Sequence, residues 1–218
     1  MRRGRRKSSS LIAFPAFTLS FEDLCARRGG RRVVEGAAAS LINGRRLDLK
    51  GPNGSGKTSL LRIFAGLIRP EDGRLSLEID GRAVSPREPG HVAWVADRDA
   101  LRPELTVAET LRFWAAFPAM TGGDSALTAL GLEPYADTPV RLLSRGWRRR
   151  TALARALMSN APIWLLDEPF AGLDEDGADR FGAALGEHLA RGGGAVIARH
   201  AANAGPPADL TLILERPE

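Results

Sequence analysis

The most informative stretch of the 218-residue chain is a glycine-rich run that ends in lysine and threonine. It fits the phosphate-binding pattern G-x-x-x-x-G-K-[ST] at every fixed position. The glycines let the backbone turn tightly and point its N–H groups at an anion. Lys57 is expected to bridge the β- and γ-phosphates of a nucleotide, and Thr58 to hold Mg²⁺. The predicted phosphate-binding residues, which run into an apolar helix, are Gly51, Pro52, Asn53, Gly54, Ser55, Gly56, Lys57, Thr58 and Ser59.

A second chemical feature is a pair of carboxylates at the end of an apolar run. Residues 163–166 are predicted to form a buried strand, and Asp167 and Glu168 follow it directly. Ligands bind at the carboxyl ends of strands in open α/β sheets. We expect Asp167 to hold Mg²⁺ through water and Glu168 to deprotonate the attacking water as a general base. The plainer alternative is a strand that ends in two solvated acids.

Another anion-binding element is predicted before a strongly helical run. It consists of Leu143, Ser144, Arg145, Gly146 and Trp147. Ser144 and Gly146 at a helix start can bind an anion, and a simple helix cap is the alternative for Ser144. Two such elements, far apart in sequence, allow two arrangements. Either both fold onto one nucleotide, or each serves a nucleotide held by a partner subunit.

Two single residues are further candidates. Asp174 follows the acid pair and is expected to cap a helix or to take part in a subunit contact beside the site. His200 ends the predicted strand 195–199 at the expected active edge, where an imidazole can contact the γ-phosphate. His91 and His188 have no such context and are interpreted as structural.

The composition narrows the class of protein. The net charge of +5 could indicate a nucleic-acid partner, but much of it lies in the first seven residues. We expect residues 1–17 to be a disordered basic tail rather than a signal peptide, because their apolar run is short and Pro15 breaks it. The single cysteine, Cys25, excludes an internal disulfide and fits a reducing compartment. No stretch approaches the roughly 18 apolar residues of a membrane span.

The remaining pattern alternates strands and helices. Glycine and asparagine mark turns at residues 29–30 and 43–44, and Thr106 with Glu109 predicts a capping box at a helix start. Asp48 and Lys50 are unusual for the strand before the phosphate loop, because buried parallel strands are almost wholly apolar. Helices inserted between two βαβ halves predict one nucleotide-binding core with a helical subdomain. Strands are predicted at residues 19–24, 32–34, 47–50, 75–79, 91–95, 163–166, 195–198 and 210–214.

These motifs, in this order, resemble the ATP-binding subunits of ABC transporters over about residues 18–215. The matching pieces are the phosphate loop, the signature segment 143–147, the acid pair, the loop 171–174 and His200. The resemblance implies an α/β P-loop NTPase core (18–95 and 161–218) with an antiparallel β subdomain and an inserted α-helical subdomain (96–160). It also implies that two subunits sandwich two ATP molecules, so that Ser144 and Gly146 serve the partner's ATP.

Within that family the chain most resembles the ATP-binding subunits for haem export in cytochrome c biogenesis, through residues 97–101, 105–114, 163–170 and 174–177. This implies Mg²⁺-dependent ATP hydrolysis coupled to an integral membrane subunit, at the cytoplasmic face of the inner membrane, with no nucleic acid. Three alternatives stay open: an exporter of another small substrate, a slow ATP-gated clamp, and a soluble ATPase linked to nucleic acid.

Three positions depart from the family pattern. The chain contains no glutamine. Family members usually have a glutamine that contacts Mg²⁺ in the loop after the strand at 92–95, and Arg98 lies near that place. Asp97 or Asp99 could substitute for it. Trp147 replaces the glutamine of the signature segment. Arg28 lies near the place of an adenine-stacking aromatic and could stack its guanidinium plane instead. The aromatics Phe113, Trp114 and Phe117 are expected either to dock a membrane subunit or to join the helical core.

Overall fold

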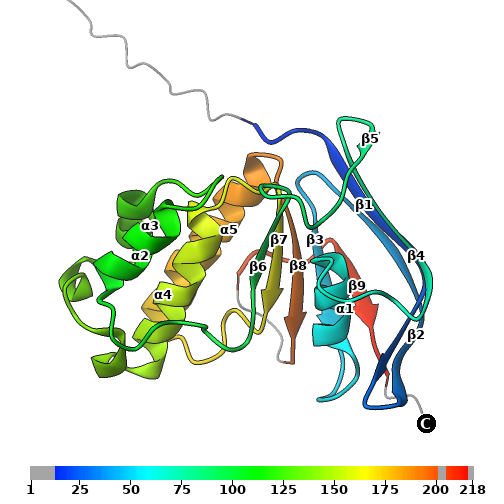
Figure 1. The fold of residues 1–218 in the computed structure, drawn as a ribbon, viewed down its shortest axis with the longest axis horizontal. Coiled ribbons are helices and arrows are strands. Elements are labelled where there is room, and N and C mark those ends of the chain that lie inside the picture. Colours follow the sequence, from blue (N-terminus) through cyan, green and yellow to red (C-terminus); the bar gives the residue numbers. More distant parts are fainter. Residues whose placement is uncertain (1–12, 201–204, 216–218) are drawn as a thin grey trace, which may run out of the picture.

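The computed structural model describes residues 13–200 and 205–215 and contains two sheets with helices on one outer side (Figure 1). The central sheet is parallel, with strand order β6-β7-β8-β3-β9. Its strands are β3 (Arg46–Lys50), β6 (Val92–Val95), β7 (Ile163–Asp167), β8 (Gly194–Arg199) and β9 (Leu210–Ile213). β7 and β8 are buried along their whole length, as apolar strands covered on both faces must be.

The second sheet is antiparallel, with order β2-β1-β4-β5. It contains β1 (Phe17–Arg28), β2 (Arg31–Ile42), β4 (Asp72–Ile79) and β5 (Arg82–Ala83). The first two strands are longer than predicted. β2 runs through an alanine-rich stretch and past Gly36, which has a positive φ of 61°, because it pairs with β1 over almost its full length. Tertiary pairing here outweighs a weak strand propensity.

The described part of the chain begins inside the predicted tail. Residues 1–12 of that tail lie outside the described residues. Phe17 is the first residue of β1 and is only 3% exposed, and the Phe14 backbone N–H donates to the Arg191 carbonyl. The folded domain therefore starts before residue 18, because aromatic side chains at this end are used to cover the core.

Helix α1 (Lys57–Phe64) lies between the two sheets, and the other helices cover the opposite face of the parallel sheet (Figure 1). These are α2 (Val107–Ala115), α3 (Gly123–Ala129), α4 (Arg145–Met158) and α5 (Glu175–Ala190), with two short 3₁₀ turns at Glu133–Tyr135 and Val140–Leu142. The predicted capping box is confirmed at α2, where Thr106 and Glu109 exchange hydrogen bonds. α3 begins at Gly123, after Gly122 takes the left-handed cap conformation.

The predicted fold class is confirmed: an α/β nucleotide-hydrolase core carries an antiparallel sheet and a group of helices. Two apolar clusters fill it, one on each face of the parallel sheet. Alternate residues of β8 supply them, with Val196 in the first cluster and Ile197 in the second. Because both clusters pack against this one sheet, the loops that follow its parallel strands are held together at its carboxyl edge.

Candidate active site

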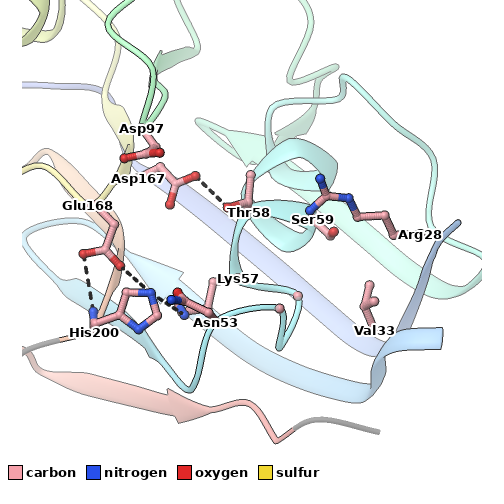
Figure 2. Close-up of a pocket in the computed structure, with 12 residues that line it drawn as sticks. Arg28, Val33, Asn53, Lys57, Thr58, Ser59, Asp97, Asp167, Glu168 and His200 are labelled. Carbon is pink, nitrogen blue, oxygen red and sulfur yellow. Dashed lines mark hydrogen bonds and ion pairs between the residues drawn. The ribbon is translucent and has the colours of Figure 1, made fainter. Parts of the chain in front are cut away.

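The carboxyl ends of four neighbouring parallel strands meet at one pocket (Figure 2). The phosphate loop follows β3, Asp97 lies after β6, Asp167 ends β7 and His200 follows β8. Ligands in open parallel sheets bind at this edge. The cavity has a volume of about 280 Å³ and is lined by Arg28, Val33, Asn53, Gly54, Gly56, Lys57, Thr58, Ser59, Asp97, Asp167, Glu168 and His200.

Two glycines of the phosphate loop occupy places that no other residue fits. Gly51 has a φ of 152°, and a Cβ there would collide with the Leu214 carbonyl; Gly56 has a φ of 92°, and a Cβ there would collide with the Val33 carbonyl. Their absence of a side chain allows the loop to curl and α1 to begin at Lys57. Backbone N–H groups at that helix start form an anion-binding site.

The Lys57 ammonium lies inside the curl of the phosphate loop. Its Nζ donates to the carbonyl oxygens of Gly51, at 2.7 Å, and Pro52, at 3.0 Å. Burial lowers the pKa of Lys57, whereas the nearby Glu168 and Asp167 carboxylates favour its charged form. A cation held by two neutral carbonyls has room for a stronger anionic partner, which a phosphate supplies.

Three oxygen-bearing side chains at the pocket fit a small hard cation. The Thr58 hydroxyl donates to Asp167 Oδ2 at 2.7 Å, and Asp97 lines the same cavity. Burial is the largest cause that raises the pKa of Asp167, and the Asp97 charge raises it further. Mg²⁺ prefers a few carboxylate and hydroxyl oxygens together with water and phosphate. A divalent cation here would offset the cost of two neighbouring carboxylates, so the residues present fit Mg²⁺.

Glu168 is held in an unusual backbone conformation beside His200. Its φ is 48°, which is rare for a residue with a side chain, and its N–H donates to the Ala198 carbonyl at 2.9 Å. Its buried Oε1 has no hydrogen-bond partner among the described residues and lies 3.4 Å from His200 Nε2. Burial raises the pKa of Glu168, and the His200 and Lys57 charges oppose that rise. A carboxylate oxygen that accepts no hydrogen bond is available to accept a proton from water.

Sequence reasoning missed Arg149, which ties the loops of the site together. The residue is 3% exposed, and its guanidinium donates to the carbonyl oxygens of Asp167, at 2.6 Å, and Glu168, at 2.9 Å. It also pairs with Asp99 at 3.1 Å, so only Asp97 of the two candidate substitutes faces the pocket. Arg98 does not line the pocket. An arginine on the buried face of a predicted helix was the signal that could have found Arg149.

The signature segment lies apart from this pocket. Ser144 caps α4 by accepting from the Trp147 N–H at 3.4 Å, and Leu143 is buried. A separate cavity lies beside this helix start and shares no lining residue with the first; its lining is Ser144, Gly146, Trp147, Arg150, Gly172 and Asp174. Within one chain, the two anion-binding elements therefore do not face one nucleotide. Of the two arrangements left open by the sequence, the one that needs a partner subunit fits this separation.

The sequence predicted two possible roles for Asp174, and the structure shows it as the helix cap of α5. Its side chain accepts from the Gly177 N–H at 3.2 Å and pairs with Arg150. The Arg150 guanidinium lies 4.2 Å from the Trp147 ring and also pairs with Asp176 at 2.6 Å. Hydrogen bonds from Arg150 are the largest cause that lowers the pKa of both aspartates.

The three aromatic residues that were predicted either to dock a partner or to join the helical core divide between these two alternatives. Trp114 is 7% exposed and belongs to the helical core, whereas Phe113 and Phe117 are 40% and 51% exposed. The exposed pair lines an apolar groove of about 360 Å³ that also includes Trp94 and Met120. Exposed aromatic side chains beside a groove mark an interaction surface more often than a solvated face.

Comparison with known proteins agrees with this geometry. Residues 34–171 match the family model described as "ABC transporter". A solved structure titled "Structure of ATP binding subunit of ABC transporter" has a TM-score of 0.73 and 25% identity, covering 84% of this chain and 79% of the other. The fold and the pocket thus define an ATP-binding subunit of the ABC transporter class.

Curated relatives narrow the class. The chain is 44% identical to the Cytochrome c biogenesis ATP-binding export protein CcmA of Paracoccus denitrificans, covering 84% of this chain and 82% of the relative. It is also 44% identical to the protein of the same name from Roseobacter denitrificans, covering 84% of each chain. The chain belongs to the CcmA family of cytochrome c biogenesis ATP-binding export proteins. No helix in residues 13–200 or 205–215 is long and apolar enough to cross a membrane.

Proposed function

We propose that this chain hydrolyses ATP in its phosphate-loop pocket and that this hydrolysis energises haem export for c-type cytochrome biogenesis. The observation that carries the proposal is the meeting of Lys57, Thr58, Asp167 and Glu168 in one cavity at the sheet edge, in a chain of the CcmA family. Each of these side chains offers a group that phosphoryl transfer requires.

Binding is assigned to the phosphate loop. Lys57 neutralises the β- and γ-phosphates, and the N–H groups from Gly51 to Ser59 cradle them. Thr58 and Asp167 would hold Mg²⁺, Asp167 through water, and Asp97 lines the same cavity and offers a further oxygen. When bound, the cation neutralises charge on the phosphates. Arg28 and Val33 line the same cavity, and Arg28 offers a flat cation that can stack on adenine.

The chemical step is assigned to Glu168 and His200. The free Oε1 of Glu168 accepts a proton from the attacking water, and burial brings its pKa upward toward the range where a carboxylate is a useful base. His200 lies beside it, with its Nε2 at 3.5 Å from Lys57 Nζ, where it can contact the γ-phosphate. Arg149 fixes the backbone that carries Glu168.

A second copy of the chain completes the site. The signature segment, with Ser144, Arg145, Gly146 and Trp147 at the start of α4, binds the ATP of the partner subunit, and Asp174 lies at the contact between the two. This assignment is supported by the separation of the two cavities within one chain. Trp147 keeps the turn at Gly146 but replaces a side-chain amide with an indole that is packed against Arg150.

The membrane partner is assigned to the groove beside α2. We propose that Phe113 and Phe117 bind an integral membrane subunit of a cytochrome c maturation system, at the cytoplasmic face of the inner membrane. The groove is apolar and its two aromatic residues are exposed, which suits an anchor contact. The runner-up is an exporter of another small substrate, which would keep the ATPase chemistry and change only the membrane subunit.

The test is gentle detergent extraction from the native membrane, followed by purification of this chain and identification of its partners by mass spectrometry. Phe117→Asp is compared with Ile42→Asp, whose native residue is 49% exposed at the end of β2 and does not line the groove. We expect a cytochrome c maturation membrane subunit to co-purify with the native chain and with Ile42→Asp, and to be lost with Phe117→Asp. A different permease would remove the haem assignment. Absence of any membrane partner would favour a soluble ATPase.

A further inference from the structure

A buried group of three charged side chains lies on the face of the parallel sheet covered by α5. Arg46 and Asp48 belong to β3 and have fully buried side chains, and the Arg199 side chain, at the end of β8, is 11% exposed. The parallel register places Asp48 opposite Ile197 and Arg46 opposite Ala195, so the three side chains share one face. This is the aspartate that was unusual for a buried strand.

Asp48 joins the two arginines. Its Oδ1 accepts from Arg46 Nε at 2.8 Å, and its Oδ2 forms an ion pair with Arg199 Nη2. The group is incompletely satisfied, because Arg46 Nη2 and Arg199 Nε have no hydrogen-bond partner among the described residues. Burial lowers the pKa of Arg46, which reflects the cost of holding its charge away from water. Buried charged groups of this kind rarely add stability over apolar replacements.

The same group holds the chain on both sides of His200. Arg199 is the residue directly before His200, and Arg46 Nη1 donates to the Pro206 carbonyl, a few residues after it. Gly205 and Pro206 lie within van der Waals range of α5: a Cβ on Gly182 would be 3.4 Å from the Gly205 Cα, and one on Gly186 would be 3.7 Å from Pro206. Gly205 and Pro206 are thus seated on α5, and Arg46 holds the Pro206 carbonyl there.

His200 itself is weakly held by its own side chain. Its side chain is 41% exposed, and its imidazole lies 3.4 Å from Glu168 and 3.5 Å from Lys57. Contacts of that length contribute little orientation. Its position beside the pocket therefore depends on the backbone, whose N–H at His200 makes a long contact of 3.4 Å with Glu168 Oε2, and the buried arginines act on the residues that flank it.

We propose that Arg46, Asp48 and Arg199 form a positioning triad that holds His200 at the γ-phosphate. This rests on the proposed function, in which His200 contacts the γ-phosphate. The triad touches no substrate and acts only through His200. It accounts for three buried charges that packing alone does not require, since apolar side chains would fill the same space.

The test replaces the triad by apolar side chains of similar volume, in Arg46→Met/Asp48→Leu/Arg199→Met. We expect the variant to fold with an unfolding midpoint at least equal to that of the native chain, to keep its KM for ATP within about twofold, and to lose about tenfold in kcat. In a His200→Ala background the same three changes should lower kcat no further, because their effect passes through His200. Arg199→Lys, made alone in the native chain, keeps a cation beside Asp48 and should therefore keep most of the native kcat. Arg45→Met removes a neighbouring exposed ion pair and should leave kcat unchanged.

Hydrogen exchange separates this proposal from the proposed function. In nucleotide-free protein, backbone amides of residues 194–200 should exchange faster in the triple variant than in the native chain, whether or not ATP is hydrolysed. Unchanged exchange, unchanged kcat in a folded variant, or an equal loss of kcat in the His200→Ala background would overturn the triad's role while leaving the ATPase intact. Failure of the native chain to hydrolyse ATP would instead overturn the proposed function. The exchange result would then still show whether the triad holds the backbone of residues 194–200 in place.

Discussion

The two helix starts for which we propose phosphate binding have acidic neighbours whose pKa values are shifted in opposite directions. At the start of α1, burial raises the pKa of Asp167 and Glu168. At the start of α4, Arg150 lowers the pKa of Asp174 and Asp176. The first pair of acids is held at some cost to the fold, whereas the second pair is stabilised by a buried guanidinium.

This difference in pKa shifts supports separate proposed roles for the two regions. Carboxylates that are desolvated and incompletely paired are poised for metal binding and proton transfer. Carboxylates that are paired with Arg150 are structural, so phosphate binding in the second region is proposed for Ser144, Arg145 and the N–H groups at the start of α4. In the proposed mechanism the first region hydrolyses ATP and the second recognises the nucleotide of a partner subunit, so that one complete site needs two copies of the chain.

The largest effect should follow from changing the base in the first region. Glu168→Gln keeps the shape of the side chain but removes its ability to accept a proton. We expect the ATPase rate to fall at least about a hundredfold, or about 2.7 kcal/mol of transition-state stabilisation, with ATP affinity retained. Lys57→Ala is the matched comparison and should weaken ATP binding instead. Undiminished turnover in Glu168→Gln would remove that residue from the base role.

A mixing experiment tests whether the two regions work in different subunits. Lys57→Ala disables the first region and Gly146→Asp the second, since an aspartate there repels phosphate while still suiting a helix N-terminus. Each variant alone should be inactive. Mixed dimers would regain one intact site of two, so an equal mixture should recover about a quarter of native activity. If the mixture stays as inactive as its parts, the two regions act within one chain.

A smaller effect on stability is expected in the second region. Asp174→Ala removes the cap of α5 and one partner of Arg150. Loss of such a cap costs about 1 kcal/mol, which lowers the midpoint of thermal unfolding by about 2–4 °C in a chain of this size. Asp179→Ala, on the same helix but without a capping role, is the control. Equal unfolding midpoints for the two variants would show that the cap contributes nothing.

The smallest expected effect is a gain in thermal stability, in the first region, and it depends on pH. A carboxylate whose pKa is raised in the folded state lowers stability once it is charged, and this penalty disappears as pH falls through the raised pKa. Glu168→Gln should therefore raise the unfolding midpoint at pH 7 by about 2 °C, the shift expected for less than 1 kcal/mol. The gain should vanish as the pH approaches 4.5, the ordinary pKa of glutamate. A gain that is independent of pH would indicate a packing effect instead.

Much of the site was predictable because it depends on local pattern. The phosphate loop requires glycines at fixed positions, and the acid pair follows a strand apolar enough to identify, so both could be located before any fold was known. Arg149 and the buried Asp48 could not be located in this way. Their partners are backbone carbonyls and arginines from distant strands, and no local pattern records which distant groups will meet.

Sequence alone determined the class of chemistry, the strand and helix order of the core, and the residue types at the phosphate loop, because each of these depends on spacing within a few residues. Tertiary structure decided which candidates share a pocket. Parallel pairing of β6, β7, β8 and β3 brings Asp97, Glu168 and His200 to one sheet edge and leaves Ser144 beside another cavity. That outcome depends on the order of strands in the sheet, which long-range packing sets and local spacing does not.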